Sequence, residues 1–158
     1  MTLYASHVPS PLGRLTVLVD EGGALARILF SHEPLTAEVA WDDAHCGPAA
    51  AQLTEYFAGR RREFDLPLAP AGSAFQQQVW AELRGVPYGE TADYRRIAER
   101  VGRPGAARAV GRANATNPIP IVIPCHRVVG ADGSLTGYAG GLGAKRTLLE
   151  LEGALAPA

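Results

Sequence analysis

The feature that most constrains this chain is an apolar run interrupted by three prolines, residues 118–124, which leads directly to Cys125. Its other residues are isoleucine and valine, β-branched types that favour buried extended chain. Proline excludes helix and removes backbone donors. We therefore predict that the run is a buried, extended and rigid segment that ends in a thiol.

Two interpretations of Cys125 are open on these residues alone. A thiolate is the nucleophilic form of cysteine, and the neighbouring charges of His126 and Arg127 would lower the pKa that produces it. Alternatively, a free cysteine is simply a small apolar residue of a core. We favour the reactive interpretation.

The composition is that of a globular protein. The chain has 158 residues, of which 47% are hydrophobic and 20% charged, and this excludes a disordered chain. The N-terminus has neither a positive segment nor an apolar one of the kind a secretion signal needs, and no apolar stretch has membrane-spanning length. We expect a cytoplasmic protein without membrane contact, in which Cys46 and Cys125 form no disulfide.

Charge is distributed unevenly along the chain. Up to Gly72, five arginines face nine acidic residues, a net charge of −4, whereas the remainder has ten basic and seven acidic residues, a net charge of +3. Six arginines lie between residues 95 and 112. Clustered arginine is typical of a polyanion-binding surface, although a solvated helix face is the alternative.

The first 72 residues indicate a small α/β domain. Residues 15–19 and 24–30 alternate as strands of a β-meander, a helix with apolar spacing ends at Gly59, and 63–68 indicate a short further strand. Residues 69–72 (Ala-Pro-Ala-Gly) are typical of a linker. We predict domains at 1–72 and 73–158.

The second half is predicted to be mostly helical. Ser73 and Gln76 fit a capping box that opens a helix, and Thr91 is a candidate cap for the next one. A break at 102–105 separates that helix from another that starts at Ala106. Two short helices joined by a glycine-containing turn form a helix-turn-helix, whose second helix normally approaches DNA.

Residues 117–128 closely resemble the active-site signature of the O6-alkylguanine-DNA alkyltransferases. Residues 88–94, 106–111, 137–142 and 148–153 also resemble family motifs, in family order. The resemblance is strong from Ser73 to Gly153 and weak before it. It implies an α+β fold: a small N-terminal ribonuclease-H-like α/β domain, followed by a mostly helical domain with a winged helix-turn-helix-like DNA-binding motif.

The activity that the resemblance implies is DNA repair by direct damage reversal. The protein would move an alkyl group from O6-alkylguanine, and from O4-alkylthymine, onto Cys125 in a single turnover. By this analogy His126 takes the thiol proton through a water, Glu152 orients the imidazole, and Asn117 stabilises the segment. Tyr94 would donate a proton toward guanine N3 as the base leaves.

The family resemblance also implies how DNA is held. The helix-turn-helix enters the minor groove and the damaged nucleotide flips out, with Arg108 filling the vacancy. Further expected DNA contacts are Arg95, Arg103, Arg112, Ala107 and Gln76. The residues expected to line the base pocket are Val128, Tyr138, Ala139 and Gly140.

The expected partner is double-stranded DNA containing O6-alkylguanine, and no cofactor or metal is expected. His45 and Cys46 lack a zinc-ligand pattern, and we interpret them as incidental surface residues. We expect a monomer in solution and leave cooperative binding along DNA open. Three other classes stay open: a non-catalytic protein that binds alkylated DNA, a cysteine hydrolase, and a structural helix-turn-helix regulator with a merely buried Cys125.

Overall fold

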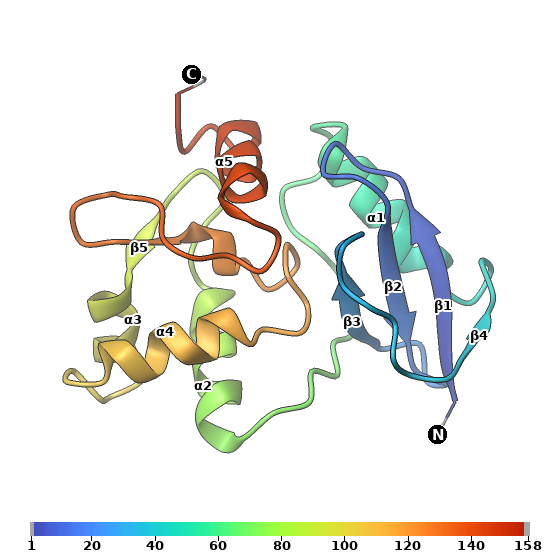
Figure 1. Cartoon of the computed structure of the whole chain (residues 1–158), viewed down its shortest axis with the longest axis horizontal. Helices are drawn as coiled ribbons and strands as arrows, with labels where there is room; N and C mark the ends of the chain where they lie inside the picture. The colour runs from blue at the N-terminus through green and yellow to red at the C-terminus, as the bar shows by residue number, and fades with distance from the viewer. Residues whose placement is uncertain (1, 157–158) are drawn as a thin grey trace. The chain divides into compact units, whose positions relative to one another are not determined.

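The structure is a computed structural model that describes residues 2–156. The chain divides into two compact units, Met1–Ala71 and Gly72–Ala158. Figure 1 shows a sheet and a helix in the first unit and mostly helices in the second. This confirms the predicted α+β class, with a small sheet-containing unit followed by a mostly helical one.

The first unit is built on a four-stranded sheet with the order β3-β2-β1-β4. Its elements are β1 (Leu3–Val8), β2 (Leu15–Val19), β3 (Leu25–Leu29), β4 (Val39–Trp41) and α1 (Gly47–Phe57). The first three strands form the predicted antiparallel meander, and β4 pairs parallel with β1. Helix α1 packs against β1 and contributes the fully buried Leu53 and Tyr56 to the core.

The strand expected over residues 63–68 does not form. Only Leu68 makes an isolated bridge, to Leu25 of β3. Pro67 has no N–H to donate, and the backbone N–H of Asp65 donates instead to the side chain of Gln52 on α1. The segment therefore runs beside the sheet without joining it as a strand.

The second unit carries the remaining elements. They are α2 (Ala74–Leu83), β5 (Ala92–Asp93), α3 (Tyr94–Arg100), α4 (Ala107–Ala115), the 3₁₀ helix η1 (Cys125–Arg127), β6 (Val128–Val129) and α5 (Leu142–Leu151). Strands β5 and β6 pair in parallel. This pairing places the start of α3 beside the residues that follow the cysteine.

Two helix starts were predicted from capping residues, with different outcomes. The capping box of α2 is confirmed: the Ser73 hydroxyl accepts from the Gln76 N–H, and the Gln76 side chain accepts from the Ser73 N–H. Thr91 does not cap α3. Asp93 does so, accepting from the Arg96 N–H at 2.8 Å, because the residues after Thr91 are held extended in β5.

Helices α3 and α4 pack against each other and form the predicted helix-turn-helix, with residues 101–106 as the turn. Helix α2 supports the pair. Its buried Trp80 donates the indole N–H to the Ala113 carbonyl on α4 at 2.8 Å. The helix with the arginines is thus fixed to the core of its own unit.

Candidate active site

The run before Cys125 is buried, as predicted, but the prediction that it is extended is wrong. Residues 118–123 form turns, closed by backbone hydrogen bonds of 2.9 Å from the N–H groups of residues 122 and 123. Ile121 has a φ of 76°, a left-handed conformation that is unfavourable for a β-branched residue. Since the prolines leave too few donors for a strand ladder, the remaining N–H groups close turns instead.

Asn117 holds this turn segment together. Its side-chain amide donates to the Ile123 carbonyl at 2.8 Å, and its amide oxygen accepts from the Ile119 N–H at 3.0 Å. Asn117 is itself buried, so both bonds are shielded from water. The amide joins the two ends of the run, which is the geometry that its expected stabilising role requires.

Cys125 begins η1 and is 4% exposed. Its carbonyl accepts a long hydrogen bond, 3.4 Å, from the side chain of Asn114 on α4. Sequence reasoning missed Asn114, which gave no signal beyond its place in a helix. Through this bond the arginine-bearing helix contacts the cysteine directly.

The expected lowering of the Cys125 pKa by its two neighbours is wrong. Burial raises the pKa of the thiol to about 11, although a hydrogen bond with Asn117 and the charge of Lys145 act in the opposite direction. Burial removes water from the charged form, and Arg127 is directed at Glu152 rather than at the sulfur. The resting residue is therefore a thiol that must lose its proton when it reacts.

Next to the cysteine lies a buried ionic cluster of His126, Arg127 and Glu152. Glu152, at the end of α5, accepts from His126 Nε2 at 2.8 Å. It also accepts from Arg127 Nε at 2.8 Å and Nη2 at 3.0 Å, while Nη1 donates to the Val86 carbonyl at 2.7 Å. The structure thus brings together the expected pair, His126 and Glu152, and adds Arg127, which sequence reasoning left without a partner.

Glu152 is an ionised carboxylate at neutral pH. Burial alone would raise its pKa, but the hydrogen bonds from His126 and Arg127 outweigh burial and lower the pKa to about 2.

The turn at Gly89 lies close to the backbone of Glu152. This glycine has a φ of 84°, and a Cβ placed on it would lie 3.3 Å from the Glu152 carbonyl oxygen. Glycine is therefore required there for both conformation and space.

His126 is neutral and its tautomer follows from the cluster. Burial lowers the pKa of the ring, even though Glu152 acts to raise it. Because Glu152 is ionised, Nε2 carries the proton and donates it to the carboxylate. Nδ1 is then an unprotonated acceptor, and it has no hydrogen-bond partner among the described residues. A buried basic nitrogen in the residue after a thiol is suited to remove the thiol proton.

Tyr94 and Lys145 complete the surroundings of the site. The Tyr94 hydroxyl, at the start of α3, is hydrogen-bonded to the Thr136 hydroxyl at 2.5 Å. Lys145 of α5 is fully buried and donates to the carbonyls of Val128 at 2.6 Å and Thr136 at 3.1 Å. Burial lowers the pKa of Lys145, against a raising effect of Cys125. Lys145 and Thr136 were both missed, since a single lysine and a loop threonine carry no distinguishing pattern.

The expected pocket residues lie on two segments. Val128 is fully buried in β6. The other three lie in the loop before α5, where Tyr138 and Gly140 are half-buried and Ala139 is exposed. Their contact with a base stays a prediction.

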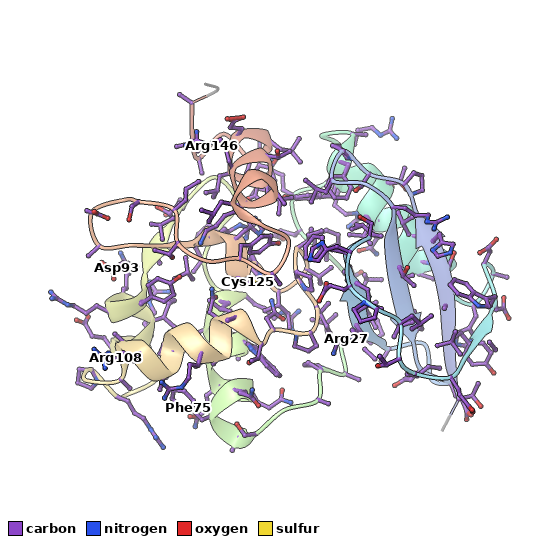
Figure 2. All side chains as sticks on the ribbon, in the orientation of Figure 1. Arg27, Phe75, Asp93, Arg108, Cys125 and Arg146 are labelled. Atoms are coloured by element: carbon purple, nitrogen blue, oxygen red, sulfur yellow. The ribbon has the colours of Figure 1, made fainter. Side chains whose placement is uncertain are left out.

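Of the arginines expected to contact DNA, three have exposed side chains and one packs on an aromatic ring. Arg108 and Arg112 are exposed on α4 and Arg95 is exposed on α3; Figure 2 labels Arg108 at the N-terminal end of its helix. The guanidinium of Arg103 lies over the Phe75 ring, 5.1 Å from its centre, a cation–π arrangement. The contacts of all four arginines with DNA stay predictions.

Two further expected contacts on α2 and α4 are less exposed. Ala107 is half-buried in the first turn of α4. The Gln76 side-chain amide donates to the Thr116 hydroxyl at 3.0 Å, and its amide oxygen accepts from the Ser73 N–H in the capping box of α2. Gln76 would therefore have to exchange these bonds to contact DNA.

In the first unit, His45 and Cys46 are not incidental surface residues, and that interpretation is wrong. Cys46 is fully buried before α1, and burial together with Asp42 and Asp43 raises its pKa to about 11. The His45 ring is hydrogen-bonded to the Asp20 carbonyl at 2.6 Å. Within residues 2–156, no group of three or more His, Cys, Asp or Glu side chains is placed to hold a metal, and no helix there is long and apolar enough to cross a membrane.

Comparison with known families identifies both halves of the chain. Residues 74–154 match the family described as "6-O-methylguanine DNA methyltransferase, DNA binding domain", and residues 3–70 match its "ribonuclease-like domain". The chain belongs to the 6-O-methylguanine DNA methyltransferase family. The resemblance inferred from the signature around Cys125 is thereby confirmed, and it extends to the first unit, where the sequence motifs were weak.

Individual relatives agree over nearly the full length. The chain is 49% identical to a methylated-DNA–protein-cysteine methyltransferase of Mycobacterium tuberculosis over 99% of this chain and 96% of the relative. It is 46% identical to the protein of that name from Methanosarcina acetivorans, over 96% and 99% of the two chains. The crystal structure of M. tuberculosis OGT in complex with DNA superposes with a TM-score of 0.91 at 47% identity, covering 98% of this chain and 96% of that one.

Proposed function

We propose that this protein repairs DNA by moving the alkyl group of O6-alkylguanine onto Cys125 in a single turnover. The observation that carries the proposal is the arrangement around the thiol. Cys125 is followed by a neutral His126 whose Nε2 is bound to Glu152 and whose Nδ1 has no partner among the described residues. Family membership indicates the substrate, and this geometry supplies the base that a buried thiol with a raised pKa needs.

In the proposed reaction His126 Nδ1 takes the thiol proton through a water. The imidazolium that results is stabilised by the Glu152 carboxylate, which Arg127 holds in place by hydrogen bonds to both of its oxygens. The sulfur attacks the alkyl carbon, so that an S–C bond forms while the bond from that carbon to guanine O6 breaks. The product is a thioether, and nothing in this sequence of steps regenerates the thiol.

The leaving guanine takes a proton at the same time. We assign this donation to the Tyr94 hydroxyl, which would protonate guanine N3 so that the base does not leave as an anion. The proton on His126 then returns through solvent to Tyr94. The net change is a thiol and an alkylated guanine converted to a thioether and guanine.

Access to the alkyl group requires the nucleotide to leave the duplex, because a thiol in a protein core cannot reach a stacked base. The exposed Arg108 at the start of α4 is the side chain we assign to the vacated position in the duplex, with binding from the minor groove. Other exposed arginines of the helix-turn-helix would contact phosphates. We further propose O4-alkylthymine as a second substrate and the cytoplasm as the location.

The alternatives now carry less support. A non-catalytic binder of alkylated DNA does not need Cys125 with a partnered His126 beside it. A cysteine hydrolase would leave the exposed arginines of α4 without a role. In a structural regulator the buried cluster of His126, Arg127 and Glu152 would serve stability alone.

One experiment separates these classes. The protein is incubated with an excess of duplex DNA that contains O6-methylguanine, and its intact mass is measured over time. We expect the mass to increase by one methyl group per molecule and then to stop, with no increase in Cys125→Ala although that variant still binds DNA. An unmodified wild-type protein, or continued demethylation beyond one equivalent, would refute the proposal.

A further inference from the structure

We propose that Thr136 is a positioning residue for alkyl transfer, which holds Tyr94 by a hydrogen bond and directs its proton toward the base. This inference rests on the proposed function, because it concerns the step in which guanine leaves. It starts from a contact between distant parts of the sequence: the hydroxyls of Tyr94, on α3, and Thr136, in the loop before α5, lie 2.5 Å apart.

Thr136 is itself held by a buried cation. Lys145, fully buried on α5, donates to the Thr136 carbonyl at 3.1 Å and to the Val128 carbonyl at 2.6 Å. An ammonium group in a core is tolerated only where strong acceptors surround it, so this anchor ties the loop to the residues that follow the cysteine. The backbone of Thr136 is therefore anchored, although the residue belongs to a loop.

The ring of Tyr94 faces a glycine on α4. A Cβ placed on Gly111 of α4 would lie 3.9 Å from two ring carbons of Tyr94, so the ring lies along the helix at a position without a side chain. The Tyr94 ring therefore faces α4, while its hydroxyl is bonded to Thr136. Holding a reacting group in one geometry is a main source of catalytic efficiency.

The direction of the hydrogen bond decides its effect. A tyrosine that donates to Thr136 has no proton to offer to a base. When guanine N3 approaches, the threonine hydroxyl can rotate and donate to the tyrosine oxygen, so that the phenolic proton points to N3. As that proton leaves, negative charge grows on the tyrosine oxygen, and a hydrogen bond to a charged oxygen is stronger than one to a neutral oxygen.

The test compares Thr136→Val, which keeps the side-chain shape but removes the hydroxyl, with Thr136→Ser, which keeps the hydroxyl. Thr147→Val on α5 removes a hydroxyl that bonds to the Gly143 carbonyl and is the matched control. The rate of Cys125 alkylation is measured by intact mass with free O6-benzylguanine, which needs no flipping. We expect Thr136→Val to be roughly 10-fold slower than wild type, the value of one hydrogen bond to a developing charge, and Thr136→Ser to restore most of the rate.

Two measurements separate positioning from general structure. An O6-benzylguanine analogue with carbon in place of N3 cannot accept the tyrosine proton, so Thr136→Val should hardly slow its reaction. For the same reason, Thr136→Val should add nothing in a Tyr94→Phe background. Equal slowing on both substrates, a further loss beside Tyr94→Phe, or a wild-type rate in Thr136→Val would overturn the inference. A wild-type protein that forms no adduct would instead overturn the proposed function.

Discussion

Replacing Glu152 by glutamine removes the one negative charge that His126 and Arg127 share. The pKa of Glu152 falls from 4.5 to about 2 in the folded protein, and each pKa unit corresponds to about 1.4 kcal/mol. The depressed pKa therefore represents roughly 3 kcal/mol of folding stability. A similar loss is expected when one partner of a buried ion pair is removed.

The pH dependence of this loss has a definite sign. Because the folded pKa is lower than the unfolded one, the stabilisation is fully present above about pH 4.5 and disappears as the pH falls toward 2. Urea unfolding of wild type and Glu152→Gln should therefore differ by about 3 kcal/mol at pH 7, and the difference should shrink steadily below pH 4.5.

Glu150→Gln is the matched control. Glu150 lies one half-turn earlier on α5 and pairs with Arg146 at 3.8 Å on a partly exposed surface, so its replacement should cost about 0.5 kcal/mol or less. Equal stability losses in the two variants, or a loss in Glu152→Gln that does not change with pH, would refute the assignment of Glu152 as a buried carboxylate.

The same variant tests the proton relay. Without the carboxylate the imidazolium of His126 loses its stabilisation, and alkyl transfer from free O6-benzylguanine should slow by roughly 100-fold, the range of general base catalysis. The reaction of Cys125 with a small thiol reagent should also require a higher pH. A folded Glu152→Gln protein with an unchanged rate and thiol titration would remove Glu152 from the mechanism.

Three other predictions follow from single side chains. Arg108→Ala should slow repair of duplex DNA severely and alkylation by free O6-benzylguanine far less, because only repair of a duplex requires a nucleotide to flip out. Equal losses of rate with the two substrates would mean that Arg108 stabilises the fold instead. Asn117→Ala leaves the buried Ile119 N–H unpaired and removes one of the two hydrogen bonds of the Ile123 carbonyl, so urea unfolding should show a loss of roughly 1–3 kcal/mol. Cys125 should also titrate at a higher pH in this variant, and an unchanged titration would exclude the Asn117 amide as its partner. Cys125→Ala should keep its affinity for duplex DNA in a binding titration, whereas a large loss would show that the thiol region shapes the DNA surface.

The sequence predicted well those features that depend on neighbours along the chain. Hydrophobic alternation located the meander, the serine–glutamine pair located the start of α2, and the glycine-containing break located the turn of the helix-turn-helix. The pairing of His126 with Glu152 was also expected, but only through the family resemblance, since 26 residues separate the two.

The sequence failed where tertiary contacts override local preference. The residues before Cys125 have the composition of a strand. They nevertheless form turns around Asn117, because prolines have no N–H to donate to a neighbouring strand. The thiol pKa rises although a histidine and an arginine follow it, because burial dominates and Glu152 takes the arginine charge. Contacts such as that of Lys145 with Thr136 have no signature in a single sequence.

The most direct test of the central claim is the position of the transferred group. Protein that has reacted with O6-methylguanine duplex is digested, and the peptides that contain Cys46 and Cys125 are analysed by mass spectrometry. Both thiols are buried with a pKa of about 11, but only Cys125 is followed by a base held by Glu152. We predict one methyl group, on Cys125 alone. Methyl groups on Cys46, or repaired DNA with both cysteines unmodified, would contradict the account.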